Sequence, residues 1–316
     1  MKKNYLDIID PIHDFIRVYD YELPIIDNPL FQRLRRIKQL SGAHLTYPSA
    51  QHSRFEHSLG VMHIATEAGF ALNEKGFLNS DDVQILRLAG LLHDIGHGPF
   101  SHLFEEVIQD KKTSHEDYGK KIILNSEIGD VLSKTGFDKK IIAQIAFGES
   151  KFQYLNEIIS GSLSADMMDY LLRDGYFTGA EHAKVDHKRI TQSLNIHKKK
   201  IALERSALYS FESMMHSRYQ MFKAVYFHKT VRAAEVMLIQ ALRLSDDEFG
   251  FSSFNLNEYV KLTDEFVISS IIFSKSSKLK RARQLAENYQ NRKLLKCVFE
   301  RILTSQTNLK KTRTDE

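Results

Sequence analysis

The spacing of apolar residues along the chain predicts a mainly helical protein. Between Asn28 and Gln39, apolar residues fall at positions 30, 31, 34 and 37, which is the spacing of one helix face. Asn28 followed by Pro29 is a typical helix start. The same reasoning predicts further helices over residues 55–72, 81–95, 99–108, 115–124, 138–147, 152–160, 164–173, 206–227, 229–243, 255–272 and 276–302.

Two short segments favour β-structure instead. Residues 14–19 have the alternating pattern of a strand, and LNIHKKKIALER within 190–204 places two β-capable runs on either side of a lysine turn. We therefore expect a mainly α fold with a small β-hairpin element and a helical C-terminal extension. The polar end of the chain, residues 305–316, is expected to be a frayed tail.

Composition narrows the class of protein. The hydrophobic share of 42% supports a sizeable core, and no apolar run approaches the roughly 18–20 residues of a membrane span. The first residues, MKKNYLDIIDPIHD, carry acids where a signal peptide would be apolar, so we expect a cytoplasmic protein without a membrane partner. The single cysteine, Cys297, excludes an internal disulfide and a cysteine-based zinc site. The net charge of +4 suits an anionic ligand without requiring nucleic acid.

Candidate chemistry is concentrated in the stretch AGLLHDIGHGPFSH, residues 89–102. His93 and Asp94 end an apolar helix, where a solvated helix end favoured by the helix dipole is an equally good explanation for the pair alone. His97 and His102 follow within nine residues, and the glycines between them permit a sharp turn. This density of titratable groups favours a functional site.

Imidazole and carboxylate groups of this kind suit a divalent metal ion with open positions for water and substrate. Two more candidates lie at helix starts elsewhere in the chain, which gives the set His57, His93, Asp94 and Asp166. The helix of Asp166 also carries Asp169 and Asp174, so residue spacing alone does not choose among these acids.

The ordered set His57, His93-Asp94 and Asp166 resembles the metal-binding pattern of the HD-domain phosphohydrolase superfamily. Seven blocks resemble, in order, those of the deoxynucleotide triphosphohydrolases related to the human SAM-and-HD-domain enzyme: DPIHDFIRV, IIDNPLFQRLRRIKQL, HSRFEHSLGV, AGLLHDIGHGPFSHLFE, MDYLLRD, HSRYQMFKAVYFHK and YVKLTDEF. The resemblance implies an HD-domain catalytic core over 1–180, without a SAM domain. It also implies a helical extension over 181–304 that completes the active site and an oligomer interface.

The resemblance further implies hydrolysis of deoxynucleoside triphosphates to deoxynucleoside and inorganic triphosphate. One divalent ion (Mn, Fe, Mg, Ni or Zn) would be held by the four residues above and would polarise the phosphate. His102 matches the group that protonates the leaving oxygen, Glu105 could orient it, and His97 and His115 match phosphate-facing groups. The residues that match substrate contacts are Gln39, Arg54, Tyr170, Asp174, Arg218 and Tyr226.

Some positions depart from the family pattern. Met167 replaces a basic residue that reaches the triphosphate, and Phe222 replaces a histidine. These changes favour an alternative, an HD-type phosphohydrolase acting on a nucleoside monophosphate, a cyclic nucleotide or a nucleic-acid end. A second alternative is a nucleotide- or nucleic-acid-binding regulator, for which the lysines 198–200 and the KKTR tail are the supporting features.

The resemblance also extends to a regulatory site. Asp27, Gln32 and Arg35 match residues that bind a guanine nucleotide at a subunit interface, so we expect a GTP or dGTP effector and a homo-oligomer, either a dimer or a tetramer. Ile9, Glu204 and Ser206 replace other residues of the effector sites, which predicts a simplified form of activation. An amphipathic helix with an N-terminal cap explains residues 27–35 equally well.

Overall fold

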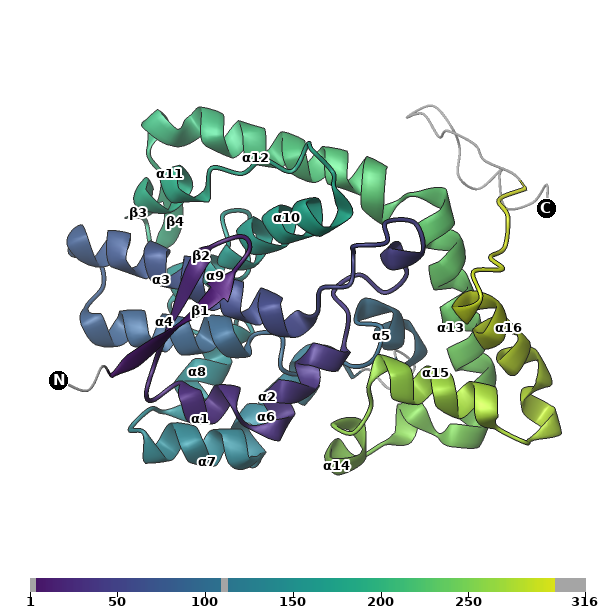
Figure 1. Ribbon diagram of the computed structural model, residues 1–316. Coiled ribbons are helices and arrows are strands. Elements are labelled where there is room, and N and C mark those ends of the chain that lie inside the picture. Colours follow the sequence, from purple (N-terminus) through teal and green to yellow (C-terminus); the bar gives the residue numbers. More distant parts are fainter. Residues whose placement is uncertain (1–3, 109–112, 299–316) are drawn as a thin grey trace.

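The computed structural model describes residues 4–108 and 113–298 and confirms a mainly helical fold, here with two small antiparallel hairpins (Figure 1). In the first hairpin, β1 (Tyr5–Asp10) pairs with β2 (Asp14–Tyr19). In the second, β3 (Leu194–His197) pairs with β4 (Lys200–Leu203). The residue pattern predicts β2 and the second hairpin but not β1, whose apolar Leu6 and Ile9 are exposed to solvent.

The helices are α1 (Leu23–Ile26), α2 (Pro29–Gln32), α3 (Arg54–Glu74), α4 (Ser80–Leu92), α5 (His102–Ile108), α6 (His115–Asn125), α7 (Glu127–Lys134), α8 (Lys139–Ala146), α9 (Gln153–Ile159), α10 (Ala165–Thr178), α11 (His187–Gln192), α12 (Leu208–Met221), α13 (Lys229–Phe249), α14 (Leu256–Tyr259), α15 (Asp264–Phe273) and α16 (Lys280–Gln290). A π-helical turn, η5 (Phe222–Tyr226), joins α12 to α13. Sequence periodicity missed α7 altogether.

Several predicted boundaries are wrong. The segment 28–39 is not one helix, because α2 gives way to a 3-10 turn, η1 (Arg33–Arg36), and Lys38 then pairs with Ser53 in a β-bridge. The segment 255–272 is split into α14 and α15, since Thr263 caps a new helix. Residues 190–192 belong to α11 rather than to a strand, and α16 ends at residue 290. The tail 305–316 lies outside the described residues.

Helix α3 is the centre of the larger apolar core and packs against α4 and α10. Almost its whole circumference is buried, as expected for a helix without a polar face. Its start is fixed by a capping box in which Ser53 and Glu56 bond reciprocally, four residues before His57. Gly60 allows α10 to approach, since a Cβ there would lie 1.9 Å from Asp169 Oδ1.

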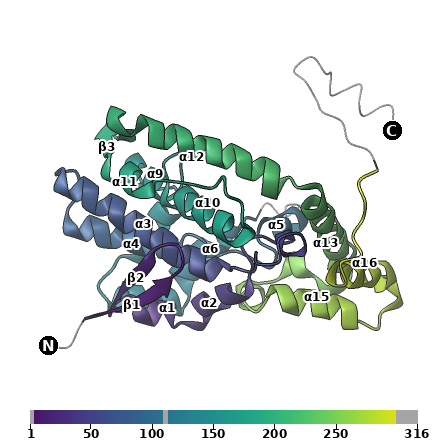
Figure 2. The ribbon, with the colours of Figure 1, turned by 45° about the horizontal axis from the view of Figure 1, so that its top comes forward.

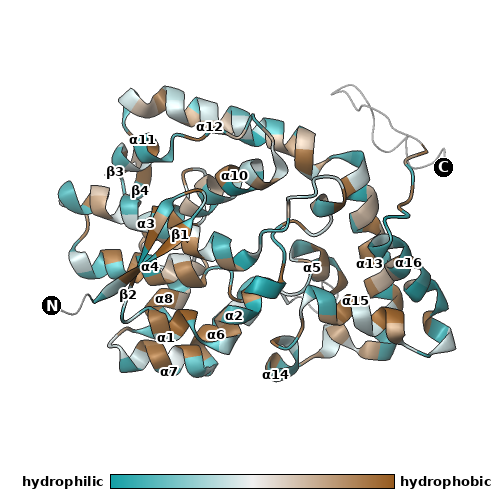
Figure 3. Cartoon of the chain, viewed as in Figure 1, coloured by the Kyte–Doolittle hydropathy of each residue, from teal (hydrophilic) through white to brown (hydrophobic). Residues whose placement is uncertain are grey.

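A second apolar cluster joins α5 to α13, α15 and α16 at the other end of the molecule (Figure 2). Apolar residues of these helices alternate with polar ones along their length (Figure 3). The division of the chain near residue 180 stays a prediction. Among the described residues, none of the helices has both the length and the apolar character needed to cross a bilayer.

Candidate functional site

A pocket of about 470 Å³ lies where the ends of α4 and α10 meet α5 and the turn between α12 and α13. Its volume is in the usual range for small-molecule sites. The predicted site residues that line it are Gln39, Arg54, His93, Asp94, His97, His102, His115, Asp166, Tyr170, Asp174 and Tyr226. His57 lies fully buried beneath it, against Asp94 and Asp166.

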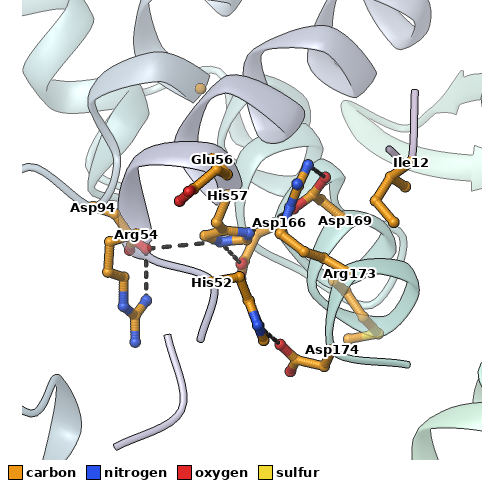
Figure 4. A network of polar contacts seen from close by, with 12 residues as sticks. Ile12, His52, Arg54, Glu56, His57, Asp94, Asp166, Asp169, Arg173 and Asp174 are labelled. Atoms are coloured by element: carbon orange, nitrogen blue, oxygen red, sulfur yellow. Dashed lines mark hydrogen bonds and ion pairs between the residues drawn. The ribbon is translucent and has the colours of Figure 1, made fainter. Parts of the chain in front are cut away.

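The floor of this pocket brings together the four residues expected to bind a metal ion (Figure 4 labels three of them). His57 Nε2 lies 3.1 Å from Asp166 Oδ1 and 3.6 Å from Asp94 Oδ2. His93 Nε2 lies 3.3 Å from Asp94 Oδ1 and 3.9 Å from Asp166 Oδ1. These atoms come from α3, the end of α4 and the start of α10, so a site forms only when the three helices pack.

The hydrogen bonds around the histidines show that a cation fits here. His93 Nδ1 donates to the Gly90 carbonyl at 2.7 Å, which leaves Nε2 as the ring nitrogen available to a ligand. That Nε2 is buried with no hydrogen-bond partner among the described residues, and it faces two carboxylates. Burial opposes protonation of His57, but the carboxylates of Asp166 and Asp169 raise its pKa to about 10. These carboxylates therefore favour a positive charge at this position. Two imidazoles and two carboxylates suit a divalent ion.

A buried network behind the floor fixes the orientation of His57. Asp169 accepts from His57 Nδ1 at 2.8 Å, from His13 Nε2 at 2.7 Å and from Arg173 Nε at 2.9 Å. Arg173, which lies beside Asp169 (Figure 4), also binds Asp10 and so anchors the first hairpin to α10. Burial opposes ionisation, but Arg173, His13 and His57 hold the pKa of Asp169 well below its usual value.

The structure gives three acids of α10 different surroundings, whereas residue spacing alone did not choose among them. Asp166 faces the pocket, whereas Asp169 lies behind His57. Asp174 accepts from His52 Nε2 and from the Tyr226 hydroxyl, both at 2.7 Å. The roles of His13 and His52 were not predicted, since each is a lone histidine whose partner is more than one hundred residues away.

Three further histidines form the wall beside Asp94. His102 Nδ1 contacts Glu105 Oε2 at 3.1 Å, while the other oxygen of Glu105 binds the ring and the backbone N–H of His115. Burial alone would raise the pKa of Glu105 and lower that of His115. Their pairing outweighs burial, so the pKa of Glu105 is lowered and that of His115 is raised. The buried ring of His97 lies nearby, and burial together with Arg54 holds its pKa well below its usual value.

Ring nitrogens of His97, His102 and His115 come within 4.8 Å of one another, which is close enough for a metal site. However, the rings of His97 and His115 are stacked, with centroids 4.0 Å apart and an interplanar angle of 13°. Imidazole lone pairs lie in the ring plane, so two parallel rings cannot both direct one at the same ion. The cluster is therefore better suited to the oxygen atoms of an anion.

The remaining polar groups of the predicted site differ in whether they line the pocket and whether they are already hydrogen-bonded. Arg54 donates to Asp94 at 2.6 Å and to Ser101 at 3.0 Å. Gln39 Oε1 is buried and, within the described part of the chain, has no partner, so it is available to a ligand. Arg218 stacks on Phe222 at 5.6 Å and is not among the described residues that line the pocket.

One wall of the pocket is aromatic. Phe222 lines it and contacts Tyr226 edge-on at 5.1 Å, and Tyr170 lies 6.5 Å from Tyr226. Burial raises the pKa of Tyr170 to about 12, so its hydroxyl stays neutral. Met167, in contrast, is part of the apolar core.

The residues expected to bind an effector lie away from this pocket. Asp27 is exposed at the end of α1. Gln32 donates to the Ile26 carbonyl at 2.8 Å and accepts from Arg35 at 2.8 Å, and the Arg35 guanidinium lies 3.5 Å above the Phe55 ring. Effector binding would have to compete with these contacts.

Comparison with known proteins places this geometry in a family. Residues 54–174 match the HD domain, and residues 185–314 match the HD associated region. The chain belongs to the HD-domain family. The four residues that could hold a metal ion and most of the pocket lining belong to the HD domain, whereas Phe222 and Tyr226 come from the associated region.

Several relatives of this HD-domain chain are similar over most of its length. A deoxynucleoside triphosphate triphosphohydrolase SAMHD1 homolog of Dictyostelium discoideum is 32% identical over 96% of this chain and 62% of its own length. The human SAMHD1 triphosphohydrolase is 30% identical over 96% of this chain and 56% of its own. An uncharacterized Bacillus subtilis protein, YwfO, is 36% identical over 82% and 64%. The chain therefore spans less than two thirds of these curated relatives.

A crystal structure of a hypothetical protein from Aquifex aeolicus has the same fold. It superposes with a TM-score of 0.83 at 35% identity and covers 98% of this chain and 81% of its own. The HD-domain assignment supports a phosphohydrolase with a divalent metal ion, whose identity none of these likenesses gives.

Proposed function

We propose that this protein hydrolyses deoxynucleoside triphosphates to deoxynucleoside and inorganic triphosphate. The observation that supports this most is the buried Nε2 of His93, which has no hydrogen-bond partner in the described part of the chain and faces two carboxylates at the floor of a nucleotide-sized pocket. His57, His93, Asp94 and Asp166 would hold one divalent ion, either Mn, Fe, Mg, Ni or Zn. The names of the Dictyostelium and human relatives support the choice of substrate class.

The chain's own residues would divide the chemistry. When bound, the ion supplies a Lewis acid for the phosphate and lowers the pKa of water. His102, whose side chain is 67% exposed and held at Nδ1 by Glu105, would protonate the departing 5′ oxygen. His97, His115 and Arg54 would face the phosphate oxygens.

Sugar recognition would use the opposite wall. Gln39 would offer the 3′-hydroxyl a buried oxygen that no described residue binds, and Asp174 would assist through the cluster that it forms with His52 and Tyr226. Tyr170 would pack against the deoxyribose and exclude a 2′-hydroxyl. Arg218 would need to leave the Phe222 ring to reach the phosphates.

The second candidate function is hydrolysis of a substrate with fewer phosphate groups. Met167 lies in the core and Phe222 gives the pocket an apolar wall, so neither residue offers charge to a triphosphate tail. A nucleoside monophosphate, a cyclic nucleotide or a nucleic-acid end would need fewer such contacts. A regulator that only binds nucleotides or nucleic acid is less well supported, because all four donor side chains are present and close together.

A product assay separates these activities. The metal-loaded protein is incubated with each of the four dNTPs, with and without GTP, and the products are resolved by ion-exchange chromatography. We expect deoxynucleoside plus intact triphosphate, and we expect Asp94→Asn to lose both metal and activity. Release of monophosphate or pyrophosphate, or full activity of Asp94→Asn, would contradict the proposal.

Regulation and assembly are also part of the proposal. GTP or dGTP would bind near Asp27, Gln32 and Arg35, and the protein would act as a dimer or tetramer in the cytoplasm. An increase in turnover with GTP that is lost in Arg35→Ala supports the effector site, whereas equal rates with and without GTP argue against it.

A further inference from the structure

The loop of residues 95–101, which carries His97 and leads into His102, has an unusual backbone. Phe100 and Ser101 have φ angles of 56° and 52°, in the left-handed region that residues with a Cβ rarely adopt. Such a conformation persists only where the surroundings hold it. The loop therefore depends on whatever binds its backbone.

The contacts that hold this loop come from the HD associated region and from the segment that precedes the HD domain. Asp264 Oδ1 accepts from the Phe100 N–H at 2.7 Å, and the Tyr259 hydroxyl donates to the Gly96 carbonyl at 2.8 Å. From the other side, Ser41 Oγ donates to the Phe100 carbonyl at 2.6 Å and Arg33 Nη2 donates to the Ile95 carbonyl at 3.0 Å. Both ends of the loop are thus bound by side chains distant in sequence.

Asp264 also connects this loop to the polar groups of the pocket. Its second oxygen accepts from the Lys38 N–H at 3.0 Å, next to Gln39. Ser101 Oγ donates to the Lys38 carbonyl at 2.9 Å and accepts from Arg54 Nε at 3.0 Å. One carboxylate therefore joins the segment of Gln39 to the turn that contacts Arg54.

We infer that Asp264 is a positioning residue for the hydrolytic reaction, which holds the strained turn at Phe100 and Ser101 so that His102 faces the leaving oxygen. The effect on catalysis rests on the proposed function, whereas the effect on the loop does not. Asp264 is 5% exposed, and burial raises its pKa to about 6, so its two N–H donors are the main compensation for its charge. The competing explanation is a purely structural role, in which Asp264 only ties α15 to the segments of Lys38 and Phe100.

Asp264→Asn tests the inference, because the amide nitrogen of Asn cannot accept one of the two backbone N–H groups. Glu265→Gln, on the next residue of the same helix, is the matched control. Hydrogen exchange followed by mass spectrometry reports on the loop without any substrate. We expect at least tenfold faster exchange in the peptide covering residues 95–101 for Asp264→Asn and no change for Glu265→Gln. Unchanged exchange in Asp264→Asn would overturn the inference.

Kinetics then test the link to His102. We expect Asp264→Asn to lower kcat at least tenfold with little change in KM or in bound metal. If Asp264 acts through His102, the double variant with His102→Ala should be no slower than His102→Ala alone. If the two losses of kcat multiply in the double variant, Asp264 has a purely structural role and the inference is overturned. If Asp264→Asn exchanges faster in the loop but the wild-type protein hydrolyses no dNTP, the proposed function is contradicted and the loop contacts remain supported.

Ser41→Ala provides a second variant if Asp264→Asn does not fold. It removes only the bond to the Phe100 carbonyl. The same increase in exchange and the same loss of kcat are expected, to a smaller degree, and wild-type values for both would overturn the inference.

Discussion

Replacing Asp169 by asparagine should weaken metal binding without touching any proposed ligand. The carboxylate is fully buried and accepts from His57 Nδ1, which fixes the ring so that Nε2 faces the pocket. An asparagine keeps the shape but has one acceptor oxygen instead of two, and it loses the charge that makes His57 a stronger ligand. Metal ligands of this kind depend on such partners.

The size of the effect follows from these contacts. Loss of the carboxylate behind a metal-binding histidine typically costs 10–100-fold in metal affinity, or about 1.4–2.7 kcal/mol. The protein itself should also lose stability, because Asp169 is an ion-pair partner of the buried Arg173. Removing one member of a buried pair costs about 3–5 kcal/mol. Since Asp10 still binds Arg173 at 2.9 Å, we expect a value near the lower limit.

Calorimetric titration of the metal-free protein with Mn²⁺ measures the affinity, and urea unfolding measures the stability. Asp10→Asn is the matched control, because it removes the other ion pair of Arg173 without contacting His57. We expect both variants to lose stability and only Asp169→Asn to lose metal affinity. Equal losses of affinity in both variants, or wild-type affinity in Asp169→Asn, would refute the proposed role of the network.

Four further changes have defined outcomes. His102→Ala should retain the metal, measured by elemental analysis, and slow turnover by about 10²–10⁴-fold as expected for loss of a general acid; loss of the metal would make His102 a ligand. Phe222→His should lower the KM for a triphosphate about tenfold, if one charged hydrogen bond of about 1.5–3 kcal/mol is regained; an unchanged KM would place the phosphate tail elsewhere. Gly96→Ala should lower the free energy of unfolding in urea by about 2–3 kcal/mol, because its Cβ would lie 2.0 Å from the His115 carbonyl oxygen, and wild-type stability would exclude this close packing. Burial raises the pKa of Asp264 to about 6, so the stability that its protonation contributes is complete below the unfolded-state pKa and is lost as the pH rises through about 6. The free energy of unfolding of wild type should therefore exceed that of Asp264→Asn by about 1 kcal/mol more at pH 5 than at pH 7.5. An equal difference at both pH values would contradict this.

The sequence predicted those elements whose apolar pattern matches their final burial. Helix α4 has one apolar face and an Asn79 cap, and it was found with nearly correct limits. The segment 28–39 has a helical pattern as well, but a tertiary contact decides its course. The Lys38 N–H is taken by Asp264, more than two hundred residues away, and the chain leaves the helix to make that bond. No local pattern contains this information.

The candidate site divides in the same way. Dense local spacing pointed to His93, Asp94, His97 and His102, which the structure brings into one pocket. The choice among the acids of α10 required the packing of α3 against α10, since Asp166 and Asp169 contact opposite nitrogens of one imidazole ring. Contacts from single residues far apart in sequence were not predictable in this way.

These observations place rigidity and variation in different parts of the pocket. The floor is fixed from the N-terminal hairpin through Asp10, Arg173 and Asp169. The loop that leads to the histidine wall is held from the associated region through Asp264. The aromatic wall is built instead on the π-helical turn between α12 and α13, where Phe222 stands. π-Helical turns are often found at functional sites, and a residue there can change without disturbing the buried charges of the floor. Differences in substrate between this chain and its relatives should therefore arise at the wall, while the phosphoester chemistry of the floor is retained.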